Sequence, residues 1–94
     1  AEVFAEQADI LRRERQRLMI SLRGMPGVTV FPSEANMILV RVPDSKRAFD
    51  GMKERKVLVK HIAGLHPLLA NCLRLTVGAP EENTMMIQAL KESL

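Results

Sequence analysis

The stretch Cys72-Leu73-Arg74-Leu75-Thr76-Val77 decides the fold, because an aliphatic side chain occupies every second position. This period of two predicts a β-strand whose aliphatic face is buried against helices. Arg74 stands at an intervening position. Its side chain is therefore expected to project from the opposite, helix-free face of the sheet.

Three helices are predicted around this strand. Residues 1–23 form the first, and Gly24 supplies a left-handed residue after its last turn. The second helix begins at a cap residue, Asp44, and runs to about Lys56. Pro80 opens the last helix, because proline suits a first helical position. The side chains expected to face the core are Phe4, Ala8, Leu11, Leu18 and Leu22 in the first helix, Ala48, Phe49 and Met52 in the second, and Met86 or Ile87, Leu90 and Leu94 in the last.

Three further strands are predicted at 28–32, 36–42 and 57–62 from their β-branched and aliphatic residues. The first two are separated by a turn at 33–35, and one helical turn is expected at 67–69. The order is α-β-β-α-β-β-α. It predicts a single α+β domain over residues 1–94: a two-layer sandwich with a small, mostly antiparallel sheet and helices on one face.

Composition narrows the classes of protein. Ninety-four residues suffice for one domain, 47% are hydrophobic and 27% are charged, which is an ordinary globular composition. The net charge of +3 does not indicate nucleic acid, because the run at 12–17 is interrupted by Glu14 and the chain has no Trp or Tyr for stacking on bases. A single cysteine, no signal peptide and no long apolar run predict a cytoplasmic protein without a membrane partner.

Standard catalytic signatures are missing from the sequence. It has no glycine-rich phosphate loop, and His61, His66 and Cys72 lack the spacing of a metal site. We therefore predict no catalytic residue, no metal site and no cofactor-binding residue within this chain. Cys72 is interpreted as a small packing residue.

Arg74 is the candidate for binding chemistry. Its guanidinium presents a planar fork of donors that matches a carboxylate or a phosphate. The alternative is an ordinary surface arginine that pairs with Glu34 or Asp44. Lys60 lies 14 residues earlier, on the neighbouring predicted strand, and a second cation near Arg74 would complete an anion site. Strand parity leaves the face of Lys60 open, so a solvated edge lysine is the other interpretation.

Several segments together resemble histidinol-phosphate aminotransferases. The run 71–78, Asn-Cys-Leu-Arg-Leu-Thr-Val-Gly, followed by Ala-Pro-Glu-Glu-Asn at 79–83, resembles the C-terminal signature of that family. Gly-Met-Pro-Gly-Val at 24–28, Pro-Ser-Glu-Ala-Asn at 32–36 and Val-Leu-Val-Lys at 57–60 agree in order and spacing. The resemblance covers essentially the whole chain.

This resemblance implies the small C-terminal domain of a pyridoxal-phosphate enzyme of the aspartate-aminotransferase fold type. Such enzymes transfer an amino group between L-histidinol phosphate and 2-oxoglutarate (forming glutamate) in histidine biosynthesis, and they work as homodimers. The large domain, which holds pyridoxal 5'-phosphate through a lysine, is not visible here, so the isolated domain is expected to be inactive. Arg74 matches the arginine that holds the anionic group of the substrate. Lys60 matches a second anion contact that is often arginine in the family; His61 receives no role.

Other classes of protein stay open. A stand-alone ligand-binding or regulatory α+β module would also use a solitary arginine, and a basic nucleic-acid binder would show salt-dependent affinity. Within the aminotransferases, substrates other than histidinol phosphate, such as aromatic amino acids, are compatible with the sequence. An isolated domain is expected to expose apolar surface on its first helix or on the Arg74 face, with Leu11, Leu18 and Met19 as candidates.

Overall fold

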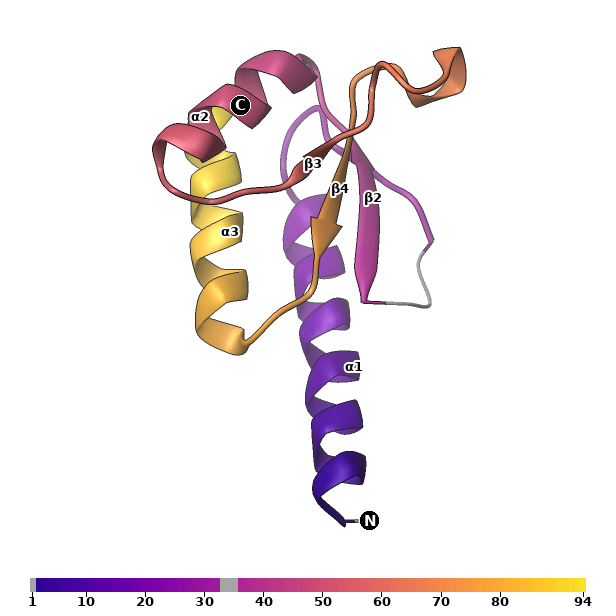
Figure 1. Ribbon diagram of the computed structural model, residues 1–94, viewed down its shortest axis with the longest axis vertical. Coiled ribbons are helices and arrows are strands. Elements are labelled where there is room, and N and C mark those ends of the chain that lie inside the picture. The colour runs from indigo at the N-terminus through magenta and orange to yellow at the C-terminus, as the bar shows by residue number, and fades with distance from the viewer. Residues whose placement is uncertain (1, 33–35) are drawn as a thin grey trace.

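The computed structural model describes residues 2–32 and 36–94, with side chains from Glu6 onward (Figure 1). Within these ranges the helices and strands follow the predicted order, and a short 3-10 helix, η1, precedes the last strand. The elements are α1 Glu2–Arg23, β1 Thr29–Val30, β2 Met37–Arg41, α2 Ser45–Glu54, β3 Lys60–His61, η1 Pro67–Leu69, β4 Cys72–Thr76 and α3 Pro80–Ser93. The predicted turn at 33–35 and the side chain of Phe4 lie outside the described part.

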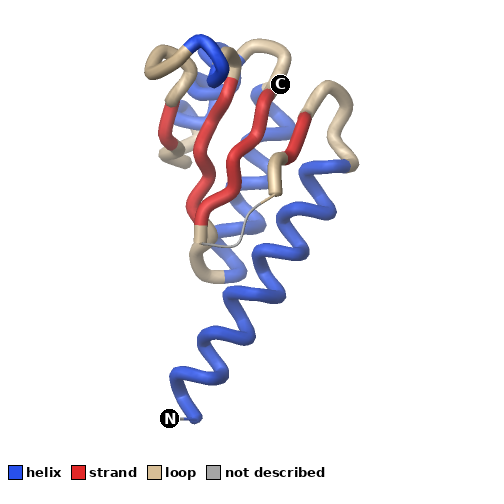
Figure 2. The backbone as a smooth tube through the Cα atoms, turned by 90° about the vertical axis from the view of Figure 1, so that its right-hand side faces the viewer, coloured by secondary structure: helices blue, strands red, loops and turns tan. Residues whose placement is uncertain are grey.

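The strands form one antiparallel sheet in the order β1-β2-β4-β3. β1 and β2 pair antiparallel, with Val30 opposite Val40. The helices pack on one side of the sheet, and Figure 2 turns the other side, which no helix covers, toward the viewer. The predicted two-layer α+β sandwich is confirmed.

The core fills the space between the sheet and the helices. Leu73 and Leu75 of β4 are fully buried, as the alternation predicted, and Ile38 and Val40 of β2 lie beside them. The helices contribute the stripes that the sequence indicated. Their fully buried apolar members are Leu18 and Leu22 from α1, Ala48 and Met52 from α2, and Leu90 from α3.

The helix ends agree with the sequence at α2 and differ at α1. The Asp44 carboxylate caps α2 by accepting the backbone N–H of Arg47 at 3.1 Å. The prediction of a left-handed Gly24 is wrong, because its N–H still bonds to Ile20 O at 3.2 Å in the manner of a helix. The chain reverses at Gly27, which has φ of 77°.

The third strand is shorter than the predicted 57–62. The N–H of Val57 donates to Met52 O at 2.9 Å, and Lys56 has a left-handed φ of 64°. Both features close the end of α2, so the backbone at this point is not available to a strand. Ladder pairing with β4 starts only at Lys60.

Part of the exposed apolar surface lies on the first helix, as predicted, but not at the residues named for it. Leu18 is fully buried, and Leu11 and Met19 are partly buried against the core. The exposed apolar side chains include Ile20, 70% exposed, and Leu58, 77% exposed. The prediction for Leu18 fails because α3 and the sheet of this same chain cover that face of α1.

In the described part of α1, only the stretch from Leu11 onward packs against the core. The first turns of the helix extend beyond the sheet and the other helices (Figures 1 and 2). Residues 6–10 are all exposed, including Ala8, which the periodicity placed inward. None of the described helices combines the length and apolarity needed to cross a bilayer.

Candidate functional site

Arg74 and Lys60 lie directly opposite each other on the sheet. β4 is an inner strand, and Arg74 pairs with Leu39 of β2 on one side and with Lys60 of β3 on the other. Side chains of opposite residues in an antiparallel pair share a face, with Cβ atoms about 5 Å apart. The neighbours of Arg74 along β4, Leu73 and Leu75, point into the core. Both cations therefore project from the open face. Strand alternation alone had left the face of Lys60 undecided.

His61 fixes the short strand that carries Lys60. Its ring lies on the helix side of the sheet, where it stacks on Phe49 of α2 at a centroid distance of 5.2 Å. Its Nε2 lies 2.9 Å from the Oγ of Ser45, at the start of the same helix. Because alternate residues of a strand point to opposite faces, docking His61 on α2 directs Lys60 toward Arg74. Sequence reasoning gave His61 no role.

The two cations have no counter-charge from the sheet. The Nε of Arg74 is buried and has no hydrogen-bond partner within residues 2–32 and 36–94. None of the described strands contains an acidic residue. Of the two acids that could have paired with Arg74, Asp44 serves as the cap of α2, and Glu34 lies outside the described residues. A buried guanidinium nitrogen without a hydrogen-bond partner is costly, and no acid on the described strands balances the charge of this guanidinium.

Arg41 is a third cation on the open face, but its donors are used. Its Nε donates to Ala70 O at 2.9 Å, and an Nη donates to Leu68 O. Its guanidinium also lies over the ring of Phe31, 5.3 Å from the centroid. Arg41 thus ties the loop between β3 and β4 to the sheet, and it differs from Arg74 in having protein partners. The alternation of β2 places Arg41 on this face, so the sequence held the signal for this third cation.

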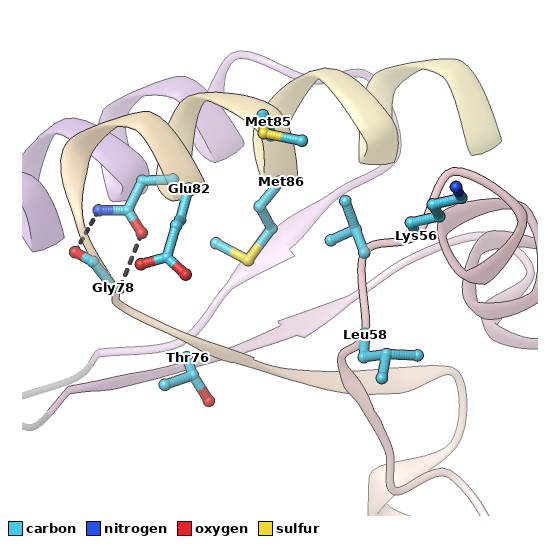
Figure 3. Close-up of a pocket in the computed structure, with 9 residues that line it drawn as sticks. Lys56, Leu58, Thr76, Gly78, Glu82, Met85 and Met86 are labelled. Atoms are coloured by element: carbon cyan, nitrogen blue, oxygen red, sulfur yellow. Dashed lines mark hydrogen bonds between the residues drawn. The ribbon is translucent and has the colours of Figure 1, made fainter.

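The cation pair lies outside the hollow drawn in Figure 3. That hollow, of about 380 Å³, opens between α3 and the segment before β3, and Figure 3 shows Met86 pointing into it. Leu58, Thr76 and Met85 also line it, whereas Arg74 and Lys60 do not. The cation pair thus lies on a single wall, the open sheet face, and an anion-binding cleft there would need a second wall.

The other candidate groups are engaged or poorly placed for chemistry. His66 caps η1, with its Nδ1 accepting the N–H of Leu68 at 3.1 Å. The thiol of Cys72 is buried, 3.6 Å from Ala70 O. All five lysines of the chain are exposed. Within the described residues, no three His, Cys, Asp or Glu side chains gather to hold a metal.

Comparisons with known proteins agree with this architecture. Residues 1–90 match the family model for class I and II aminotransferases. The chain is 70% identical over 88 residues to the histidinol-phosphate aminotransferase of Methylibium petroleiphilum, covering 94% of this chain and 24% of that protein. It is 59% identical to the histidinol-phosphate aminotransferase of Acidovorax sp. strain JS42, covering 100% of this chain and 26% of that protein.

Solved structures show the same fold. The histidinol-phosphate aminotransferase of Clostridium acetobutylicum superposes with a TM-score of 0.85 at 21% identity, over 94% of this chain and 27% of that one. The L-threonine-O-3-phosphate decarboxylase of Porphyromonas gingivalis gives 0.78 at 24% identity, over 87% and 26% of the two chains. The chain spans about a quarter of the length of the curated relatives it matches. Since the family model covers nearly all of its residues, the chain belongs to the class I and II aminotransferases.

Proposed function

We propose that residues 1–94 form the C-terminal small domain of a histidinol-phosphate aminotransferase, in which Arg74 and Lys60 bind the anionic group of the substrate. The observation that carries this proposal is the juxtaposition of the two cations on the open face, with the Arg74 Nε buried and unsatisfied. The names of the curated relatives support the choice of substrate.

The two cations would act differently on a bound anion. The guanidinium fork of Arg74 can give two parallel hydrogen bonds to a phosphate or an α-carboxylate and so orient it. The Lys60 ammonium adds a mobile point charge from the neighbouring strand. One cationic site then serves both half-reactions, taking the phosphate of histidinol phosphate and the carboxylate of glutamate or 2-oxoglutarate. Holding that end of the substrate presents its amine or carbonyl to chemistry elsewhere.

Pyridoxal 5'-phosphate would supply the electron sink for transamination, but the described residues of this chain do not fit it. A cofactor lysine must be enclosed and desolvated, whereas all five lysines here are exposed. The rings of Phe31 and Phe49 are occupied by Arg41 and His61. We therefore assign cofactor binding to the rest of the full-length enzyme, which would also supply the second wall of the cleft.

The remaining expectations belong to the same proposal. A full-length enzyme of this kind is expected to be a cytoplasmic homodimer acting on small molecules. Phosphate-bearing substrates are favoured over aromatic amino acids, because two adjacent cations suit a dianion better than a single carboxylate.

The test compares Arg74→Ala with Arg47→Ala in the full-length enzyme, since Arg47 is an exposed arginine on α2. The substrates are L-histidinol phosphate and L-histidinol, which lacks the phosphate. We expect Arg74→Ala to lower kcat/KM for the phosphorylated substrate by about a hundredfold and to abolish the preference over histidinol. Arg47→Ala should leave both values unchanged. Equal behaviour of the two variants would contradict the proposal.

A second measurement separates this function from a stand-alone module. Calorimetry of the 94-residue chain with histidinol phosphate and glutamate should give no tight binding, because half of the cleft is missing. Micromolar affinity of the isolated chain would favour the module instead.

A further inference from the structure

The turn that follows β4 is held by one buried amide, Asn83. Its Oδ1 accepts the N–H of Gly78 at 2.8 Å, and its Nδ2 donates to the O of the same residue at 2.9 Å. Figure 3 draws both bonds as dashed lines at Gly78. Asn83 is only 1% exposed, although it lies in the first turn of α3, which begins at Pro80 as predicted. A buried side chain that hydrogen-bonds to both the N–H and the C=O of one residue holds that residue in place.

The same amide reaches the long helix. Asn83 Nδ2 also donates to Glu14 Oε1 of α1 at 3.1 Å. Glu14 in turn accepts from Arg17 at 2.6 Å, and Arg17 donates to Pro80 O at 3.1 Å. The guanidinium of Arg17, together with the Asn83 amide, lowers the pKa of Glu14, so this carboxylate is charged where it receives the bond. Charged acceptors make such bonds stronger than neutral ones.

This network lies at the end of β4 where the sheet gives the least support. β2 pairs with β4 along its whole length, but β3 pairs only with Leu73 and Arg74. Among the described strands, only β2 therefore pairs with the part of β4 that follows Arg74. The backbone then leaves the sheet at Gly78, four residues after Arg74. The bonds of Asn83 hold the backbone just beyond this end of the strand, at Gly78.

We propose that Asn83 is a positioning residue: it fixes the end of β4 against α1 and so sets where Arg74 presents its guanidinium to the substrate anion. The inference rests on the function proposed for Arg74 and adds a group that does not touch the substrate. The hydrogen bonds of Asn83 would couple α1 to the sheet face that carries Arg74. Two bonds to Gly78 hold the strand, and the bond to Glu14 holds the helix.

The experiment measures substrate preference in the full-length enzyme carrying Asn83→Ala. We expect KM for L-histidinol phosphate to rise about five- to tenfold, with kcat changed less than about twofold and the constants for L-histidinol unchanged. A purely structural role would lower the active fraction and so reduce the rates with both substrates equally. Ser93→Ala is the matched control, because Ser93 is a buried polar residue at the far end of the same helix, bonded to Ala89 O.

Reversing the polarity of the bond supplies a rescue. Asn83→Asp alone places a second carboxylate against Glu14 and should impair the phosphorylated substrate at least as much as Asn83→Ala. Adding Glu14→Gln provides an amide donor to that carboxylate and should recover part of the lost preference. Absence of any recovery, with both proteins folded, would contradict coupling through this bond.

A double-mutant cycle with Arg74→Ala separates failure of the function proposed for Arg74 from failure of the role proposed for Asn83. If Asn83 acts through Arg74, Asn83→Ala has no further effect on the preference once Arg74 is removed. If Arg74→Ala leaves the preference intact, the proposed function fails. If Arg74→Ala abolishes it while Asn83→Ala reduces both substrates equally, only the role of Asn83 fails.

Discussion

Replacing Arg74 by methionine should make the isolated 94-residue chain more stable while removing the proposed anion site. Methionine keeps the length and flexibility of the arginine stem, so packing against Leu39 is largely preserved. The substitution removes the buried Nε, which has no partner among the described residues, and the like charge directly opposite Lys60. Most core or network residues behave in the opposite way, since truncating them destabilises a fold.

The size of the effect follows from two contributions. A buried donor without a partner costs about 1–3 kcal/mol, and a like-charge pair directly across two strands costs about 0.2–1 kcal/mol. Arg74 is only half-buried, which places the first contribution at its lower end. We expect Arg74→Met to raise the free energy of unfolding by about 1 kcal/mol. For a domain of this size that corresponds to about 4–8 °C in Tm. Lys60→Met removes the repulsion alone and should gain less.

Urea unfolding with and without inorganic phosphate measures both the expected gain in stability and the expected loss of anion binding. Phosphate at ten times its dissociation constant stabilises a chain with one site by about 1.4 kcal/mol, and this gain should be absent from Arg74→Met. The general salting effect of phosphate is shared by both proteins and cancels. A loss of 1 kcal/mol or more in Arg74→Met, at an unchanged urea slope, would show that the arginine has a structural partner and is not reserved for a ligand.

Three further predictions concern the scaffold. The Arg17 guanidinium holds the pKa of Glu14 below its ordinary value of 4.5, so the charged carboxylate stabilises the fold above that pH, and this stability is lost as the pH falls through the lowered value. Glu14→Gln should therefore destabilise the chain at pH 7 and make no difference near pH 2, as urea titrations at the two pH values would show. Leu18→Ala should cost about 2–5 kcal/mol in the same assay, because Leu18 is fully buried, whereas Ile20→Ala, at a side chain 70% exposed, should cost less than about 0.5 kcal/mol. Leu58→Lys should reduce self-association in sedimentation experiments without moving the urea midpoint, because Leu58 is 77% exposed.

Local patterns were enough to predict the elements and the face of Arg74. The alternation around Arg74 and the cap at Asp44 depend only on neighbours within a few residues. The left-handed glycine was misplaced because Gly24 and Gly27 are both suitable, and the choice depends on how far helical bonding persists. The start of the third strand was predicted too early for a similar reason, since Val57 bonds back to α2.

The position of Lys60 could not be predicted from its own strand. Val57 to Ile62 is apolar on both parities, so alternation gives no preferred face. The choice is made by tertiary contacts: His61 stacks on Phe49 and bonds to Ser45, both in α2. Asn83 escaped notice likewise, because its partners Gly78 and Glu14 are 5 and 69 residues away. Nothing in the residues next to it shows that its side chain is buried.

Carboxylates support the turn that follows β4, whereas the described strands themselves carry none. Glu14 and Glu82 serve the turn after β4, where Glu82 accepts the N–H of Ala79 at 3.0 Å. The described strands carry no acid, so the guanidinium of Arg74 receives no such partner four residues upstream of the turn. A fold selected for stability alone would gain by placing an acid opposite Arg74, yet the register places Lys60 there. The pair of like charges raises the free energy of the folded domain, and an anion bound to both cations would lower it. Affinity for such an anion and stability of the domain are therefore linked.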